Sequence, residues 1–203
     1  MDFAELRAQA IDTARTKLRS PLAKDEVLIH AYRCTQNAPD ALEHWLFALF
    51  PQIHPTKARE LVKKKGKDAH DEQGIGATMD EKGWESLILV CKGKQPKLDV
   101  LAKHAAPNMH ALLGAQAAAE IVDCAGSLMS LSRMTQRDCM MLGNETGQFG
   151  GTPKKSILFK HELAKTERSL RVLSSRTVLA ARLDVYSGNF KGESLRQEVL
   201  YAQ

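Results

Sequence analysis

The sequence predicts an all-α protein, and three observations carry that prediction. Apolar residues recur at three- and four-residue steps through nearly the whole chain, which is the spacing of one helix face. Aromatic residues make up only 5% of the 203 residues, while the strong helix formers alanine and leucine are plentiful. No segment sustains the alternation of apolar and polar residues that is typical of a half-buried strand. With 43% hydrophobic residues, the chain can bury one or two cores.

The N-terminal half is expected to be a series of helices separated by prolines and glycines. An amphipathic helix over residues 2–19 is followed by one that starts at Ser20-Pro21 and should break at Pro39, which lacks an N–H donor. The polar, glycine-bearing segment from Asp68 to Thr78 is expected to be a loop. The later helices of this half should begin at caps or first-turn prolines, in the order Asn37 or Asp40, Thr56, Asp80 and Pro96.

The C-terminal half is expected to contain a small-residue helix, several short helices and one long helix. The glycine-rich segment from Gly143 to Thr152 predicts a loop. The stretch from Ser156 to Lys160 is the one place with strand character, so the fold should contain at most a short β-hairpin. The helices should cover Asn108–Cys124, a short segment capped by Ser127, Thr135–Leu142, Lys165–Val185 and Lys191–Tyr201.

The charge balance makes a polyanionic partner plausible. The net charge is +5 and the isoelectric point is about 9.0. The run Lys63-Lys64-Lys65-Gly66-Lys67 has two interpretations, a solvated turn or a tip that contacts phosphate. The four cysteines have no close pairing, so they are expected to be buried free thiols. There is no signal peptide and no apolar run of roughly 20 residues, so a cytoplasmic protein without a membrane partner is expected.

No set of residues suited to catalysis, cofactor binding or metal binding emerges from the sequence. The seven histidines are scattered along the chain. His70 lies among Asp68, Asp71 and Glu72, but a solvated acidic loop explains this cluster better than a metal site does. Gly74-Ile75-Gly76 lacks the strand–turn–helix context of a nucleotide-binding loop. The protein is therefore expected not to be an enzyme.

Several short motifs occur in an order that points to a known family. They are Ala106-Pro107-Asn108, Ala125-Gly126-Ser127-Leu128, Leu142-Gly143 and Ala180-Ala181-Arg182-Leu183-Asp184. This series resembles the Nop domain of archaeal box C/D ribonucleoprotein core proteins and of their spliceosomal relatives. The resemblance implies a helical arm over residues 1–104, an abbreviated antiparallel coiled coil with its tip near 63–78, and a Nop domain over 105–203. The family's fibrillarin-recruiting N-terminal domain has no counterpart, so fibrillarin is not an expected partner.

The resemblance also implies a function and a set of contact residues. Family members hold a kink-turn RNA together with a small protein that is already bound to it, so both are expected partners, with self-association possible through the arm. The residues implied in RNA binding are Glu145, Phe149, Lys154, Lys155, Lys160, Arg168, Arg171 and Arg176. The residues assigned to contacts with the partner protein are Asn108, Gln116, Arg133 and Gln136.

Three positions depart from the family pattern. Thr146 and Gly150 stand where the family has lysine and arginine, and Lys155 replaces a histidine that could stack on RNA. These departures favour an alternative function, in which the domain is a protein–protein interaction module without RNA binding. The basic isoelectric point and the arginines of the long helix favour RNA.

Overall fold

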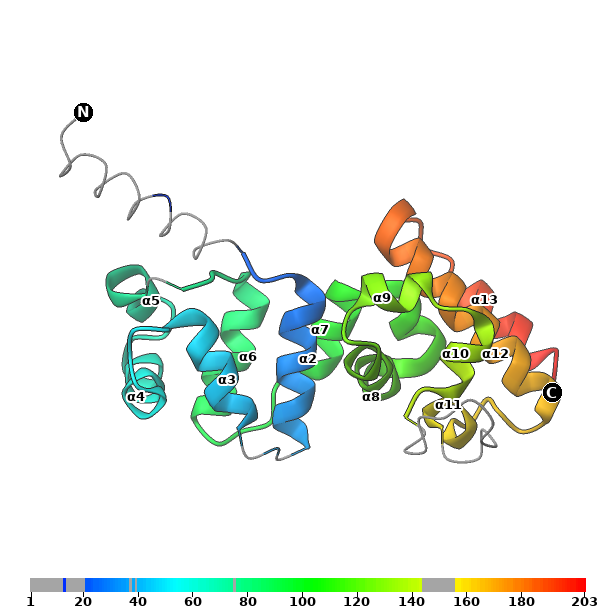
Figure 1. The fold of residues 1–203 in the computed structure, drawn as a ribbon, viewed down its shortest axis with the longest axis horizontal. Helices are drawn as coiled ribbons and strands as arrows, with labels where there is room; N and C mark the ends of the chain where they lie inside the picture. Colours follow the sequence, from blue (N-terminus) through cyan, green and yellow to red (C-terminus); the bar gives the residue numbers. More distant parts are fainter. Residues whose placement is uncertain (1–12, 14–20, 37, 39, 75, 144–155) are drawn as a thin grey trace. The chain divides into compact units, whose positions relative to one another are not determined.

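The computed structural model describes residues 13, 21–36, 38, 40–74, 76–143 and 156–203, and within them the protein is all-α, as predicted (Figure 1). The β-type pairing in this part of the chain is an isolated bridge between Pro21 and Thr78. The chain divides into two compact units, residues 1–23 with 33–97 and residues 24–32 with 98–203. Across the described residues, no helix combines the length and the apolar character needed to cross a membrane.

The first unit contains α3 (Ala41–Leu49), α4 (Pro55–Lys65), α5 (Asp68–Gln73) and α6 (Glu81–Cys91), and α4 packs against the other three. These helices have 6 to 11 residues each, whereas a coiled coil repeats over several heptads. The expected coiled coil is therefore not confirmed. The largest fully buried side chains of this unit are Trp45, Leu46, Leu49, Phe50 and Leu87.

Two expectations for this unit are wrong. The first part of the expected loop, Asp68–Gln73, is the helix α5. It carries His70 into the interior between the rings of Phe50 and Trp84, at centroid distances of 5.5 and 5.6 Å. Burial of an imidazole between aromatic rings accounts for His70 as a packing residue. The cap of α4 is His54, whose Nδ1 accepts from the Thr56 backbone N–H at 3.5 Å, and not Thr56 itself.

The second unit is built around α8 (Pro107–Ala125), the longest helix in it. Residues 24–32 of α2 (Lys24–Thr35) belong to this unit. The elements that pack against α8 are α7 (Leu98–Ala105), α9 (Leu128–Arg133), α11 (Ile157–Lys160), α12 (Glu167–Arg182), the π-helix η2 (Leu183–Ser187) and α13 (Gly192–Leu200). The short helix α10 (Gln136–Met141) packs against α11 and α12. One cluster of buried apolar side chains joins these helices, including Met109, Leu112, Ile121, Leu131, Leu158 and Leu173.

Most helix starts in the described chain match the sequence prediction. The Asp80 carboxylate accepts from Gly83 N–H at 2.9 Å, Ser127 Oγ accepts from Ser130 N–H at 3.0 Å, and Thr135 Oγ1 accepts from Asp138 N–H at 3.2 Å. Each bond satisfies a donor that the first helical turn leaves without a partner. The strand expected over 156–160 is wrong, because Ser156 Oγ caps Phe159 N–H at 3.2 Å and starts the helix α11.

The cysteines are free thiols, as expected, but they are not all buried. Cys91 and Cys139 are buried, Cys34 is half-buried, and Cys124 is exposed near the end of α8. Burial raises the pKa of Cys91 to about 11 and that of Cys139 to about 12, so both stay protonated at neutral pH. The expectation for Cys124 was wrong because it was based on apolar neighbours in the sequence, whereas Cys124 itself lies on a solvent-exposed face of α8.

Candidate functional site

The segment of residues 144–155, which holds four of the implied RNA-binding residues, lies outside the described residues, and its two flanks are held together. The Ile157 backbone N–H donates to the Leu142 carbonyl oxygen at 3.1 Å. Gly143 has φ +75°, and a Cβ there would come within 2.7 Å of Ile157 Cγ1. A side chain at position 143 would therefore be strained and would separate the two flanks. Glu145, Phe149, Lys154 and Lys155 belong to this segment.

The helix α11 follows the segment and presents a cation to solvent. Ser156, at its cap, is fully buried, and Leu158 packs into the core. Phe159 and Lys160 are exposed on the other side. The packing of α11 against α8, α10 and α12 fixes where Lys160 emerges.

A kink in α8 anchors the connection from α11 to α12. Gly114 has φ 78° and ψ 169°, which interrupts the helical hydrogen bonds and leaves preceding carbonyl groups available. His161 Nε2 lies 3.0 Å from the Leu113 carbonyl oxygen, and Leu163 N–H donates to His161 Nδ1 at 3.2 Å. This arrangement assigns the neutral imidazole with its proton on Nε2. His161 therefore holds the connection to α8.

A second bond at the kink comes from α13. Arg196 Nη1 donates to the Leu112 carbonyl oxygen at 3.5 Å, and Arg196 Nη2 pairs with the Glu162 carboxylate at 3.1 Å. The kink in α8, the α11–α12 connection and α13 are thus joined by polar contacts as well as by the apolar core. This network holds the start of α12 in place relative to α11.

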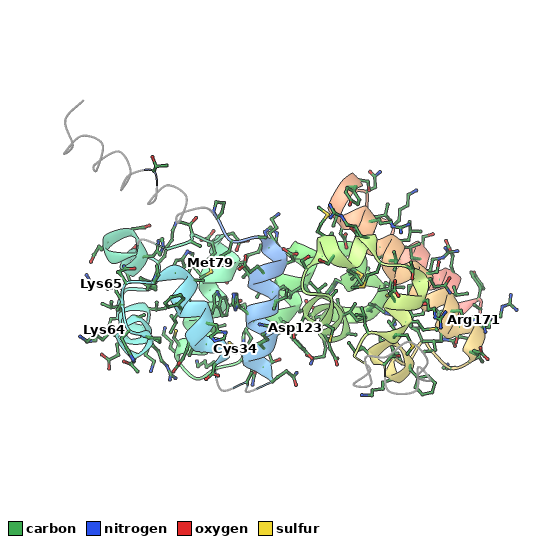
Figure 2. The ribbon with its side chains drawn as sticks, in the orientation of Figure 1. Cys34, Lys64, Lys65, Met79, Asp123 and Arg171 are labelled. Atoms are coloured by element: carbon green, nitrogen blue, oxygen red, sulfur yellow. The ribbon has the colours of Figure 1, made fainter. Side chains whose placement is uncertain are left out.

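The four described cations among the implied RNA-binding residues fall into two groups. Lys160 and Arg168 are exposed and form no ion pair with any residue that the structure describes. Arg171 is exposed but pairs with Glu167 one turn away, at 2.5 Å. Arg176 pairs with Glu198 of α13 at 2.5 Å and is only half-exposed. The geometry therefore leaves Lys160 and Arg168 free for a ligand, and Figure 2 shows Arg171 pointing outward from α12.

The residues assigned to protein contacts also differ in exposure. Gln116 and Arg133 are exposed, on α8 and at the end of α9. Gln136 is exposed too, and its Nε2 donates to the Arg171 carbonyl oxygen at 2.8 Å, which ties α10 to α12. Asn108 is fully buried, so its side chain is not available to a partner. The structure gives Asn108 a role inside the domain instead.

That role is a network with Asp184, which the sequence did not reveal. Asp184 Oδ1 accepts from Asn108 N–H at 2.9 Å and from Asn108 Nδ2 at 2.7 Å, and Asp184 Oδ2 accepts from Met109 N–H at 3.1 Å. Burial raises the pKa of the Asp184 carboxyl, and the N–H donors of Asn108 and Met109 oppose that rise. Asp184 in η2 therefore caps the N-terminus of α8, where Ala106 supplies no side-chain cap.

Asn108 extends the network to the segment before α13. Its Nδ2 donates to the Asn189 carbonyl oxygen at 3.0 Å, and its Oδ1 accepts from Lys191 N–H at 2.6 Å. The Ala-Pro-Asn and Ala-Ala-Arg-x-Asp motifs are both visible in the sequence, but only the fold brings them together. Arg182, from the second motif, donates instead to the Ser132 carbonyl oxygen at 2.9 Å.

An exposed aromatic side chain marks another part of the surface of this unit. Tyr186 in η2 is 63% exposed, and its hydroxyl lies 3.3 Å from Met129 Sδ. Hydrogen bonds involving Ser132 and Arg133 lower the pKa of the Tyr186 hydroxyl. We call Met129, Arg133 and Tyr186 the η2 patch. Arg133 was predicted as a contact residue from the sequence, whereas Met129 and Tyr186 were not.

No group of three potential metal ligands occurs among the residues with described positions. In its described residues the second unit is all-helical, with a polar network inside and the exposed cations Lys160 and Arg168 outside. Residues 98–202 match the family model described as "Nop: snoRNA binding domain, fibrillarin". The chain belongs to the Nop family.

Comparisons with individual proteins agree with this assignment. Nucleolar protein 56 of Dictyostelium discoideum is 34% identical over 108 residues, covering 46% of this chain and 20% of that protein. The U4/U6 small nuclear ribonucleoprotein Prp31 of Xenopus laevis is 28% identical over 109 residues, covering 46% and 22%. The chain thus matches only about a fifth of the length of each of these relatives.

A solved structure shares the fold over nearly the whole chain. The structure of a fibrillarin/Nop5p complex contains a chain that is 19% identical, with a TM-score of 0.51, and the match covers 99% of this chain and 79% of that chain. At this identity the likeness concerns the fold alone.

Proposed function

We propose that this protein is a non-catalytic scaffold of a ribonucleoprotein, which recognises a kink-turn-type RNA together with the small protein bound to it. Support comes from membership of the Nop family, whose description names snoRNA binding. A similar protein, Prp31 of Xenopus laevis, is named as a small nuclear ribonucleoprotein. No cofactor is part of the proposal, and fibrillarin is not proposed as a partner.

The main support for the proposal is a pair of exposed cations without an ion pair to any described residue, Lys160 and Arg168. They follow the segment 144–155, whose flanks are held together by the bond between Ile157 N–H and the Leu142 carbonyl oxygen. Lys160 ends α11 and Arg168 lies in the first turn of α12, and these two helices pack against each other. Lys154 and Lys155, from the segment between the flanks, add two further positive charges by sequence. Exposed lysine and arginine side chains without an ion pair can neutralise and hydrogen-bond the phosphates of an RNA backbone.

Replacing Lys160 and Arg168 together by Gln should weaken RNA binding and reduce its salt dependence. Each lost phosphate contact lowers the slope of log affinity against log salt by about one, so the double variant should lose about two. Fluorescence anisotropy of a labelled kink-turn RNA at several KCl concentrations measures this slope. The matched control, Lys103→Gln with Lys191→Gln, removes the same charge elsewhere in the unit and should change the slope by less than half as much.

The alternative function, a protein–protein interaction module without RNA binding, is favoured by a specific observation. The η2 patch exposes an aromatic ring and a methionine beside an arginine, a composition enriched at protein interfaces. Arg171 and Arg176 are already in ion pairs, which reduces the charge available to RNA. If the alternative is right, Tyr186→Ala should abolish capture of the kink-turn protein without RNA, and the Lys160/Arg168 variant should leave that capture unchanged.

A further inference from the structure

The first unit carries a concentration of positive charge that the proposed RNA site in the second unit does not use. Arg59 and Lys63 lie one turn apart on the same face of α4. Arg59 Nε donates to the carbonyl oxygen of Cys91, the last residue of α6, at 3.2 Å. Lys92 follows directly. The helix α4 packs against α6, and Lys63 and Lys92 are both exposed. We call Arg59, Lys63 and Lys92 the α4–α6 basic surface.

Two carboxylates of this unit form ion pairs with lysines outside this surface. Glu72 pairs with Lys65, and Glu85 pairs with Lys97 at 2.8 Å. Glu60 lines an open hollow of about 600 Å³ together with Lys57 and Lys64. Within the described part of the chain, none of the three residues of the α4–α6 basic surface forms an ion pair.

Folding alone does not account for this charge. The C-terminus of α4 offers the equivalent of about half a negative charge to the cations near it. Lys63, Lys64 and Lys65 all lie in that last turn, and Figure 2 shows Lys64 and Lys65 on the outside of the helix. Like charges one turn apart on a helix, such as Arg59 and Lys63, repel each other. A bound polyanion would remove this repulsion.

We propose that the α4–α6 basic surface binds the phosphate backbone of the RNA that this protein holds, as a second contact outside residues 98–202. This inference rests on the proposed function and adds a second RNA surface to it. Lysine ammonium groups and an exposed guanidinium on two neighbouring helix ends suit phosphates, which they contact without reading sequence. The contact should therefore strengthen binding to RNA that extends beyond the kink-turn, whatever its sequence.

The test uses the full chain and two labelled probes, a minimal kink-turn RNA and the same RNA extended by a duplex of about two helical turns. Lys63→Gln with Lys92→Gln is the test variant, and it leaves the Arg59 bond to Cys91 in place. The control, Lys57→Gln with Lys64→Gln, removes the same charge from the other face of α4. Urea unfolding confirms that both variants are as stable as the parent.

We expect the test variant to bind the extended probe roughly tenfold more weakly, with the salt slope reduced by about two. The control should keep most of the parent's slope. If both variants lose the same affinity and salt slope, the effect is one of net charge, and the proposal that this surface binds RNA is wrong. If the salt slope of the test variant is unchanged, this inference is wrong. If the Lys160/Arg168 variant has a reduced slope in the same experiment, the proposed function still holds. If the parent binds neither probe, both proposals fail.

Discussion

Replacing Asp184 by Ala is expected to destabilise the second unit by about 3 kcal/mol, because three N–H groups of Asn108 and Met109 lose their acceptor together. A buried donor left without a partner costs roughly 1–3 kcal/mol, and the N-terminus of α8 also loses a negative charge near its dipole. Urea unfolding followed by circular dichroism measures the loss. The exposed residue Glu193 provides the control, since Glu193→Ala should change stability by less than about 0.5 kcal/mol.

The partner residue allows a sharper test of this network. Asn108→Ala removes one of the bonds to Asp184 and also the bonds to Asn189 and Lys191. Because the two side chains share a bond, the double variant should be less destabilised than the sum of the single variants, by about 0.5–3 kcal/mol. Strict additivity, or an Asp184→Ala variant as stable as the Glu193→Ala control, would show that the network does not hold the two motifs together.

Replacing Gly192 by Ala should also destabilise the second unit, by about 1–3 kcal/mol. A Cβ at this position would lie 2.7 Å from the Asn108 carbonyl oxygen and 2.7 Å from Ala111 Cβ. The backbone oxygen cannot move aside without shifting the start of α8, so the added methyl group forces α13 away from it. Thermal unfolding should show a midpoint several degrees lower.

Two further variants separate this contact from a general effect on α13. Ser194→Ala, an exposed change in the same turn, should leave the midpoint nearly unchanged. Adding Ala111→Gly to Gly192→Ala relieves the contact with Ala111 Cβ but not the one with the backbone oxygen, so it should restore little stability. A Gly192→Ala protein with the parent's midpoint would contradict the close packing of α13 on α8.

Local sequence signals predicted the helices well, because those signals act over a few residues. Asp80, Ser127 and Thr135 cap the helices expected of them, and Gly188, with φ 64°, ends the π-helix η2 that follows α12. The error at 156–160 has a local cause too. The apolar run Ile157-Leu158-Phe159 is too short for its periodicity to distinguish strand from helix, and the Ser156 cap decides for the helix.

The candidate site was only partly predictable, because its polar contacts join residues far apart in the chain. Sequence pattern selected Lys160 and Arg168, which the structure leaves free, but it could not show that Glu198 pairs with Arg176. It also selected Asn108 as a surface residue, although the fold buries it against Asp184, 76 positions away. Tyr186 was missed as well; it lies in the π-helix η2 after α12, where its side chain is exposed.

The most direct test of the central claim is to compare the affinity of the full chain for a kink-turn RNA alone and for the same RNA with its kink-turn protein already bound. A scaffold that recognises both surfaces should bind the preassembled complex at least tenfold more tightly, a difference of about 1.4 kcal/mol or more. The Lys160/Arg168 variant should lose affinity for both forms. Equal affinity for the two forms, or binding of the kink-turn protein that is just as tight without RNA, would contradict recognition of a joint RNA–protein surface.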